Sequence, residues 1–315
     1  MQLNLNERAY RRCRLLLEDS CAYRVTVSHT RSGTCLVDCG VEAVGGLEAG
    51  RLVAEVCLAG LGTVSLLSPS SEAPGIPLVS VYTDHPVAAC LGSQYAGWRI
   101  AGQDFFAMGS GPMRAAYGEE VFFDGLVPRE AATVAVGVLE GDRLPHEDIC
   151  LTLAAQCRVP PDSLVLLVAK TSSLVGSVQV AARSVETALH KLHQLGFDLQ
   201  TIRSAWGTAP LAPPAANDLE AIGRTNDSVL YGAEVTLWLA ADDSQIEQIG
   251  PQTPSEASRD YGRPFLETFR SYDCDFYRVD PLLFSPAVVH FCNISTGRCF
   301  SYGRKNWQIL NQSFR

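Results

Sequence analysis

Short apolar runs alternate with a helical pattern in the middle of the chain, and this alternation restricts the fold more than any other feature. "AATVAVGVLEG" (residues 131–141) and "SLVLLVAKTSS" (residues 163–173) are rich in β-branched residues and bounded by turn signals, which predicts two buried strands. The segment between them has a helical pattern that stops before Pro160. A strand, a helix and a second strand in this order favour a sheet with helices packed against it.

Hairpin patterns flank this region near both ends of the chain. Residues 23–40 alternate apolar and polar side chains around a turn at residues 31–33, and residues 286–303 contain two short β runs around a turn at residues 295–297. An opening helix is predicted over residues 3–20. The mixture of hairpins and strand–helix units predicts an α+β fold rather than a regular doubly wound sheet.

Two polar segments that contain proline, residues 68–77 and 242–264, indicate boundaries within the chain. Because both terminal regions resemble hairpins, we expect them to pair with each other. The predicted division is therefore one α+β domain from residues 1–80 plus 265–315, and a second, α/β-like domain from residues 81–264. A helix expected around residues 182–193 lies in the second domain.

The composition excludes several classes of protein. The chain has 315 residues, of which 47% are hydrophobic and 19% charged, as in a globular protein with a buried core. A formal net charge of -9 argues against a broad nucleic-acid-binding surface. No apolar run approaches the roughly 18 residues that a membrane span requires, and the N-terminal segment lacks the apolar core of an export signal. We therefore expect a cytoplasmic protein with no membrane partner.

The eleven cysteines are most simply buried side chains of a protein in a reducing compartment. Their number is odd, and no two are spaced as C-x-x-C. Cys35 and Cys39 are four residues apart and remain possible metal ligands, although no second pair stands at zinc-binding spacing.

The segment "ARSVETALHKLH" (residues 182–193) carries the strongest candidates for chemistry. On a helix, Arg183, Glu186, His190 and His193 cluster beside the apolar face. A carboxylate at that boundary is partly desolvated, which favours its protonated form, whereas an arginine one turn away favours the charged form. Such opposed effects are typical of a general base. An ordinary exposed ion pair is the alternative, and a metal site would depart from the H-E-x-x-H signature.

Small residues precede a proline at a predicted helix start in "GSGPMR" (residues 109–114). Backbone N–H groups at such a point can hold an anion or a polar ring, and Ser110 and Arg114 would lie beside it. The spacing matches neither the dinucleotide-binding fingerprint nor the phosphate-binding loop, so a simple turn remains an alternative.

Two further segments have both a structural and a functional interpretation. "GRTNDS" (residues 223–228) places Arg224, Asn226 and Asp227 close together, either as a helix cap or as a polar loop that recognises a heteroaromatic ligand. "WGTAPLAPPAAND" (residues 206–218) is a stiff loop, which either connects two elements or forms the wall of a pocket.

Taken in order, these segments resemble the methenyltetrahydromethanopterin cyclohydrolase family. The resemblance covers most of residues 80–303 and rests on "GSGPMRA", "LVGSVQVAARSVETALHKLHQLGFD", "WGTAPLAPPAANDLEAIGRTNDSVLYGAEV" and "SPAVVHFCNISTGRCFSYG". The most specific parts are "RSVETALHKLH" and "GRTNDSVLYG" at their present spacing.

The resemblance implies a hydrolase that acts on the C–N bonds of a cyclic amidine. It would reversibly hydrolyse the methenyl bridge of a tetrahydromethanopterin-type one-carbon carrier to the formyl derivative, without a metal or a separate cofactor. The resemblance further implies an α+β subunit of two parts, a cleft between them that binds the pterin, and a homotrimer. Arg183 and Glu186 match the catalytic pair of the family.

The chemistry of such a substrate is consistent with this pair. A carboxylate attracts the amidinium-like cation and accepts a proton from the attacking water, so Glu186 is predicted to be the base and Arg183 to assist it. Gln179 is predicted to orient the water or the formyl oxygen. The other predicted substrate-binding residues are Ser110, Arg114, Arg224, Asn226 and Asp227.

Two alternatives stay open at this point. The chain could be a metal-dependent hydrolase that uses Glu186, His190 and His193, or a protein that binds the carrier without turning it over. The sequence does not distinguish methanogenesis from formaldehyde oxidation as the pathway served.

Overall fold

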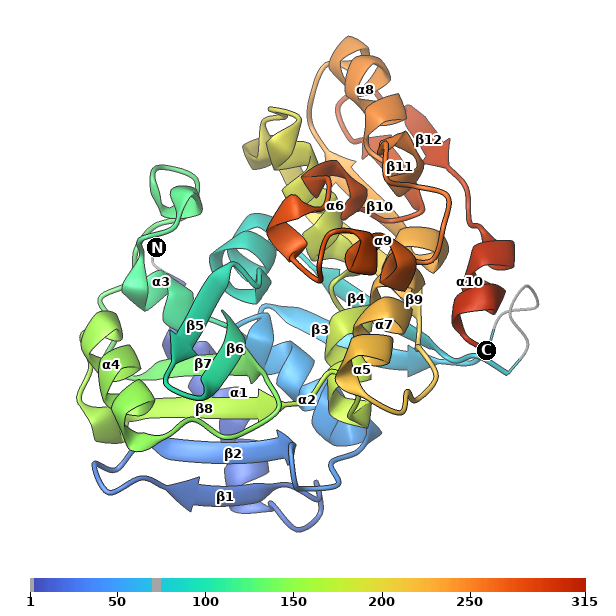
Figure 1. Cartoon of the computed structure of the whole chain (residues 1–315). Coiled ribbons are helices and arrows are strands. Elements are labelled where there is room, and N and C mark those ends of the chain that lie inside the picture. Colours follow the sequence, from blue (N-terminus) through green and yellow to red (C-terminus); the bar gives the residue numbers. More distant parts are fainter. Residues whose placement is uncertain (1–2, 70–74) are drawn as a thin grey trace. The chain divides into compact units, whose positions relative to one another are not determined.

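The computed structural model describes residues 3–69 and 75–315 (Figure 1). The chain forms two compact units, each built from two segments: Met1–Thr63 with Ala88–Gln179, and Val64–Val87 with Val180–Arg315. We call them unit 1 and unit 2. Each contains a six-stranded sheet with both parallel and antiparallel neighbours, together with helices. The α+β fold class predicted from the sequence is therefore confirmed.

The sheet of unit 1 has the order β1-β2-β8-β7-β6-β5. Its strands are β1 (Thr26–His29), β2 (Cys35–Gly40), β5 (Trp98–Gly102), β6 (Phe105–Ser110), β7 (Ala135–Glu140) and β8 (Leu164–Ala169). The central strands β2, β8 and β7 are parallel, whereas β1, β6 and β5 are added in antiparallel pairing. The hairpin predicted over residues 23–40 is β1–β2, and the two predicted buried strands are β7 and β8.

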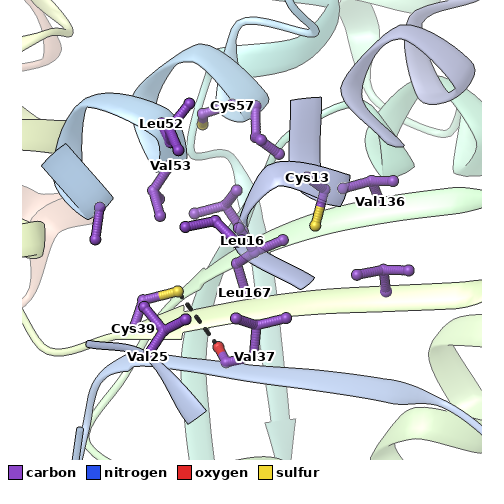
Figure 2. Close-up of a cluster of buried hydrophobic side chains, with 14 of the residues drawn as sticks. Cys13, Leu16, Val25, Val37, Cys39, Leu52, Val53, Cys57, Val136 and Leu167 are labelled. Atoms are coloured by element: carbon purple, nitrogen blue, oxygen red, sulfur yellow. Dashed lines mark hydrogen bonds between the residues drawn. The ribbon is translucent and has the colours of Figure 1, made fainter. Parts of the chain in front are cut away.

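Helices cover both faces of this sheet, which explains why its central strands are apolar throughout. The helices are α1 (Leu5–Glu18), α2 (Leu47–Cys57), α3 (Met113–Tyr117) and α4 (Glu147–Cys157). Leu167 of β8 packs with Leu16 of α1 and Leu52 of α2 in the cluster drawn in Figure 2. Its neighbour Leu166 faces the opposite side, in the cluster that contains Leu153 of α4. Successive strand residues thus supply two cores.

The sheet of unit 2 has the order β12-β11-β10-β9-β4-β3. Its strands are β3 (Gly62–Leu67), β4 (Leu78–Thr83), β9 (Ile202–Pro210), β10 (Glu234–Leu239), β11 (Val288–Asn293) and β12 (Cys299–Gly303). Strands β10 and β11 are parallel, while β4–β9, β9–β10 and β11–β12 pair antiparallel. The hairpin predicted over residues 286–303 is β11–β12.

One face of this sheet packs against α6 (Ser184–Gln194). The approach is so close that a Cβ at Gly207 of β9 would lie 2.5 Å from Ser184 Oγ and 3.1 Å from Val185 Cγ2. Residues of the other face remain accessible, among them Tyr82, which is 53% exposed, and Trp206, which is 43% exposed. We call this second face the open face of the sheet.

A second core of unit 2 lies around α7 (Asp218–Gly232), α9 (Phe265–Ser271) and α10 (Trp307–Ser313). Tyr231 is fully buried there, and its hydroxyl donates to the carbonyl oxygen of Arg263 at 2.6 Å. The remaining helices are α5 (Leu174–Ala181), α8 (Asp243–Ile249) and the π-helix η1 (Val87–Gln94), with short 3₁₀ turns at Val121–Phe123, Pro161–Ser163, Leu199–Thr201, Gly250–Gln252, Ser255–Ala257, Phe276–Arg278 and Pro281–Leu283. In the part of the chain described here, no helix is both long and apolar enough to span a membrane.

The predicted domain division differs from the structure. Residues 1–63 belong to unit 1 and residues 265–315 to unit 2, so the two terminal regions do not form one domain. The physical reason is that each terminal hairpin extends a different sheet: β2 pairs with β8, and β11 pairs with β10. A hairpin pattern shows that two strands pair with each other but not which third strand they join.

The two predicted boundary segments have different outcomes. Residues 242–264 fold as α8 and short 3₁₀ turns, with Ile246, Thr253 and Ser255 buried, so this segment is part of unit 2 and not a linker. In the segment 68–77, residues 70–74 lie outside the residues that the structure describes.

Three predicted elements can be compared with the structure at their exact bounds. The helix expected around residues 182–193 is α6, which begins at Ser184; a break at residues 182–183 separates it from α5, which ends at Ala181. Residues 223–228 are not a loop or a cap but lie inside α7, whose cap is Asn217: its side chain accepts from the N–H of Glu220 at 3.0 Å. Of the stiff loop expected at residues 206–218, the first part, as far as Pro210, belongs to β9.

Candidate active site

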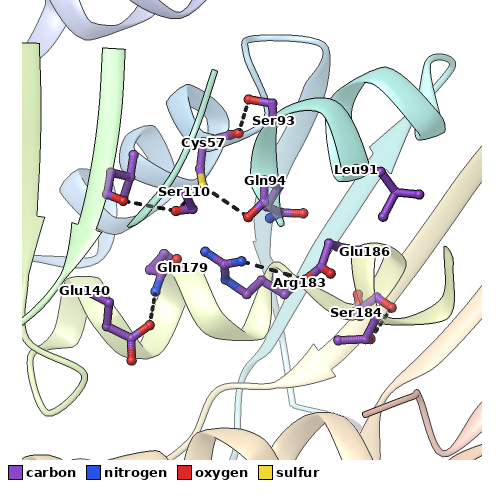
Figure 3. A network of polar contacts seen from close by, with 12 residues as sticks. Cys57, Leu91, Ser93, Gln94, Ser110, Glu140, Gln179, Arg183, Ser184 and Glu186 are labelled. Atoms are coloured by element: carbon purple, nitrogen blue, oxygen red, sulfur yellow. Dashed lines mark hydrogen bonds and ion pairs between the residues drawn. The ribbon is translucent and has the colours of Figure 1, made fainter. Parts of the chain in front are cut away.

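Arg183 and Glu186 form a buried ion pair at the start of α6. Arg183 is the residue that caps the helix, and its carbonyl oxygen accepts from the N–H of Thr187 at 2.9 Å. One turn later Glu186 projects from the same side, so that Arg183 Nη1 lies 3.7 Å from Glu186 Oε2 (Figure 3). Arg183 is 7% exposed and Glu186 is 5% exposed. The spacing of three residues seen in the sequence therefore corresponds to an ion pair in the structure, and both side chains of the pair are buried.

Burial changes what this pair can do. An exposed i,i+3 ion pair contributes about 0.3 kcal/mol and little else. In a buried setting the effective dielectric constant is lower, so the charges of Arg183 and Glu186 act more strongly on each other and on a bound cation. Glu186 also lies in the first turn of α6, where the helix dipole favours a negative charge. The arrangement suits a carboxylate that attracts a cation and accepts a proton during a reaction.

The same helix carries two further buried basic side chains. Burial, together with the nearby His193 and Lys191, lowers the pKa of His190 to about 4, so His190 is neutral at physiological pH. Lys191 is fully buried and donates through Nζ to the carbonyl oxygen of Leu282. Burial lowers the pKa of Lys191 to about 8, although Asp280 opposes the change. Lys191 was not among the candidates from the sequence, because a lysine in an amphipathic helix ordinarily faces solvent.

The metal-dependent alternative requires at least three donor side chains that lie close together. Among residues 3–69 and 75–315, no three His, Cys, Asp or Glu side chains are placed to hold a metal ion together. This applies to Glu186, His190 and His193, and also to Cys35 and Cys39. Both cysteines point into the core of unit 1 that contains α1.

Gln179 contributes to a polar cluster in unit 1. Its Nε2 donates to Glu140 Oε2 at 3.3 Å (Figure 3), and the hydroxyl of Thr171 donates to the other carboxylate oxygen of Glu140. Gln179 is 3% exposed and Thr171 is 4% exposed. The amide that was predicted to orient a water is thus itself oriented by a carboxylate.

Glu140 and Thr171 were not predicted as site residues from the sequence, although their positions at the ends of two predicted strands indicated such a role. Glu140 is the last residue of β7, and Thr171 follows the end of the neighbouring strand β8. These two strands are parallel, so their carboxyl ends lie at one edge of the sheet, where α/β proteins commonly place their binding residues. Knowing that the two strands pair would have been enough to bring these residues together.

The structure gives Ser110 and Arg114 internal partners. Ser110 Oγ donates to the carbonyl oxygen of Val138 at 3.1 Å and lies 3.3 Å from Cys57 Sγ. Arg114 is fully buried; it forms an ion pair with Glu120 and donates through Nη1 to the carbonyl oxygen of Leu91 at 2.9 Å. These contacts support a structural role for Arg114 rather than the predicted contact with substrate.

The residues predicted on α7 do not converge on one site. Arg224 and Asn226 are two positions apart, so they project about 200° apart around the helix axis. Arg224 Nη1 donates to the carbonyl oxygen of Pro214 at 2.5 Å, and Asn226 Nδ2 donates to that of Ile222 at 2.8 Å. Asp227 is fully buried, and its Oδ1 accepts from the N–H of Phe265, the first residue of α9, at 2.8 Å. Asp227 therefore holds α9 against α7.

Comparison with known proteins shows which family the chain belongs to. A family model described as Cyclohydrolase (MCH) matches residues 4–314. A methenyltetrahydromethanopterin cyclohydrolase of Rhodopirellula baltica is 47% identical over 290 residues, which cover 90% of this chain and 87% of that protein. Proteins of the same name from Xanthobacter autotrophicus and Methanothermobacter marburgensis are 47% and 38% identical; the matches cover 95% of this chain, and 89% and 95% of those proteins. The chain therefore belongs to the MCH cyclohydrolase family.

Proposed function

We propose that this chain is a methenyltetrahydromethanopterin cyclohydrolase, which reversibly hydrolyses the methenyl bridge of a tetrahydromethanopterin-type one-carbon carrier to the formyl derivative. Membership of the family and the shared name of relatives that match along almost their whole length support this activity. The observation that carries the mechanism is the buried pair of Arg183 and Glu186.

Glu186 is proposed as the base that activates water. The bridging carbon of the substrate is part of an amidinium-like cation and is electrophilic. A carboxylate beside it stabilises the cation and accepts a proton as water adds to the carbon. Arg183 keeps Glu186 charged before the reaction and stabilises negative charge that develops on the adding oxygen.

The same carboxyl group can then complete the reaction. Addition of water gives a neutral carbinol, and Glu186 holds the proton removed from the water. When the adduct collapses, the bond from the bridging carbon to one ring nitrogen breaks, and protonated Glu186 donates its proton to that nitrogen. The hydroxyl proton leaves as the formyl C=O forms, so that one cation and one water yield the formyl compound and one free proton.

The test follows the decay of the methenyl absorbance with the native protein and with Glu186→Gln. Glutamine keeps the size of the side chain and removes the proton acceptor, so we expect a rate loss of roughly 100- to 10,000-fold. The matched control is Glu48→Gln, which breaks the i,i+3 pair with Arg51 on the surface of α2, where Glu48 has 58% of its side chain exposed. The control should retain the native rate.

Other outcomes separate the alternatives. Decay that is unchanged in Glu186→Gln would keep the activity and remove Glu186 from the mechanism. Binding of the carrier without decay in the native protein would indicate the non-catalytic carrier-binding role. Loss of activity on treatment with a chelator, restored by zinc, would support the metal-dependent alternative.

The finer expectations are part of the same proposal. Assembly as a homotrimer and a cytoplasmic location follow from the resemblance and from the sequence pattern. Light scattering on the purified protein measures the assembly, and a mass of one or two chains would contradict the trimer. Gln179, held by Glu140, is proposed to orient the water or the formyl oxygen. Gln179→Met removes the amide without adding a charge beside Glu140, and it should lower the hydrolysis rate by a larger factor than it lowers the equilibrium constant for folding.

A further inference from the structure

Two cysteines face each other across the hairpin at the edge of the sheet in unit 2. Cys292 on β11 is the register partner of Cys299 on β12, and their Sγ atoms lie 3.1 Å apart. Cys299 is exposed and Cys292 is partly buried. Neither residue has a place in the mechanism proposed above.

The hydrogen bonding of the hairpin explains why the two thiols meet. The N–H of Asn293 donates to the carbonyl oxygen of Arg298 at 2.8 Å. Asn293 and Arg298, which are next to the two cysteines, are therefore a hydrogen-bonded pair. Cys292 and Cys299 are therefore a non-hydrogen-bonded pair, the type in which side chains of antiparallel strands come closest. Two residues along the strands, His290 Nδ1 and Ser301 Oγ meet at 2.8 Å on the same side.

The pair lies on the open face of the sheet, opposite α6. Cys292 is in register with Trp238 of β10, and Trp238 with Ser204 of β9. Ser204 and Trp206 are two positions apart and share a face, whereas Gly207 points the other way, towards α6. The thiols are thus on the side of this sheet that does not carry Glu186.

We propose that Cys292 and Cys299 are a redox-active dithiol, which a small disulfide oxidant such as oxidised glutathione converts reversibly into an intramolecular disulfide across β11 and β12. This inference does not depend on the proposed hydrolase activity. Non-hydrogen-bonded neighbours have Cα atoms about 4.5 Å apart, within the range that a disulfide bridges without moving the backbone.

The reaction proceeds by two exchanges. Cys299, the more exposed thiol, attacks one sulfur of oxidised glutathione; a Cys299–glutathione disulfide forms and one reduced glutathione leaves. Cys292 then attacks Cys299 Sγ, the bond to glutathione breaks, and a second reduced glutathione leaves. Two protein thiols are oxidised to one disulfide while one oxidised glutathione is reduced to two molecules of glutathione, and excess reduced glutathione reverses both steps.

The disulfide would secure the edge of the sheet. β12 is the last strand, and its hairpin turn is held to α8 by Arg298, which pairs with Asp243 at 3.2 Å and Glu247 at 3.0 Å. The bond would close only the short loop of residues 293–298, so its effect on stability is modest. We expect the melting temperature to rise by roughly 2–5 °C on oxidation.

The experiment treats the native full-length protein with oxidised glutathione and maps its tryptic peptides. Arg298 lies between the two cysteines, so trypsin separates them into peptides 279–298 and 299–304. We expect these peptides to be joined by a disulfide, two hydrogen atoms lighter than their sum, and released by reduced glutathione. Loss of two reactive thiols for each chain should accompany the linkage.

Single variants test the order of the steps. In Cys292→Ser, glutathione should remain attached to Cys299, because no second thiol can displace it. Cys21→Ser and Cys274→Ser remove the other exposed cysteines and should leave the linkage intact. The proposal is overturned if the native protein keeps glutathione on Cys299, if no linked peptide forms, or if the linked peptide joins other cysteines.

Discussion

Arg183 Nη1 lies 3.7 Å from Glu186 Oε2, and a helix break places Arg183 at the N-cap position of α6. The carbonyl oxygen of Arg183 accepts the first hydrogen bond of the helix, and its guanidinium remains able to contact the Glu186 carboxylate. A continuous helix would give the same sequence spacing. The first turn adds the favourable effect of the helix dipole on Glu186.

The geometry of the Arg183 side chain should matter as well as its charge. We expect Arg183→Met to lower the hydrolysis rate by roughly 100- to 1,000-fold, the loss typical of removing one donor that stabilises a transition state. Arg183→Lys keeps the charge but not the planar group, and should lose about 10-fold. Steady-state rates measure both, with Arg14→Met, which breaks the exposed pair with Glu18, as control. Equal rates for Arg183→Met and the native protein would exclude a role for Arg183.

The buried pair of Arg114 and Glu120 should stabilise unit 1 strongly. Glu120→Gln leaves the guanidinium of Arg114 buried without its counter-charge, which we expect to lower the free energy of unfolding by about 3–5 kcal/mol. The control is Asp124→Asn, since the pair of Arg129 and Asp124 is exposed and should contribute about 0–1 kcal/mol. Urea unfolding measures both variants. Similar losses in the two would contradict the structural role of Arg114.

Asp227 should make unfolding depend on pH. Burial raises the pKa of Asp227 from 3.8 to about 7, although hydrogen bonds from the side chain of Ser313 and the backbone N–H of Phe265 oppose the change. Between these values the folded state holds a proton that the unfolded state has lost, so the contribution of this group to stability falls as pH rises from about 4 to 7. The slope is about 1.4 kcal/mol for each pH unit.

Asp227→Asn removes this titration and keeps an acceptor for the N–H of Phe265. We expect the variant to gain stability relative to the native protein as the pH rises from about 4 to 7. Above pH 7 the difference should stay constant. Thermal unfolding at a series of pH values measures it, and parallel curves for the two proteins would contradict the raised pKa.

Gly176 in α5 should not tolerate a side chain. A Cβ at this position would overlap the carbonyl oxygen of Lys170, which belongs to the backbone and cannot move aside easily. We expect Gly176→Ala to cost about 2–4 kcal/mol of stability, as other forms of overpacking with backbone shifts do. Gly196→Ala is the comparison, because a Cβ at Gly196 would meet no atom within 4 Å. Only the φ of +77° at Gly196 is unfavourable for alanine, and we expect it to cost about 1–2 kcal/mol. Urea unfolding should rank Gly176→Ala as the more damaging change.

Local patterns predicted those features that depend on neighbours in the sequence. The hairpins β1–β2 and β11–β12, the strands β7 and β8, and the helix between them follow from periodicity and turn residues. The contact of Arg183 with Glu186 follows from a spacing of three residues. Local patterns also explain the errors on α7, because the polar run of residues 223–228 resembles a cap although the helix continues through it.

The sequence by itself determined the class of fold, the family and the spacing of Arg183 and Glu186, since each depends on residues close together in the chain or on motifs in a set order. Only the tertiary structure decided which sheet each terminal hairpin joins, that Gln179 meets Glu140, and that Arg114 and Asp227 are buried. These features depend on pairing between strands and helices distant in sequence. A strand presents the same N–H and C=O groups to every possible partner, so packing across the whole unit selects among them.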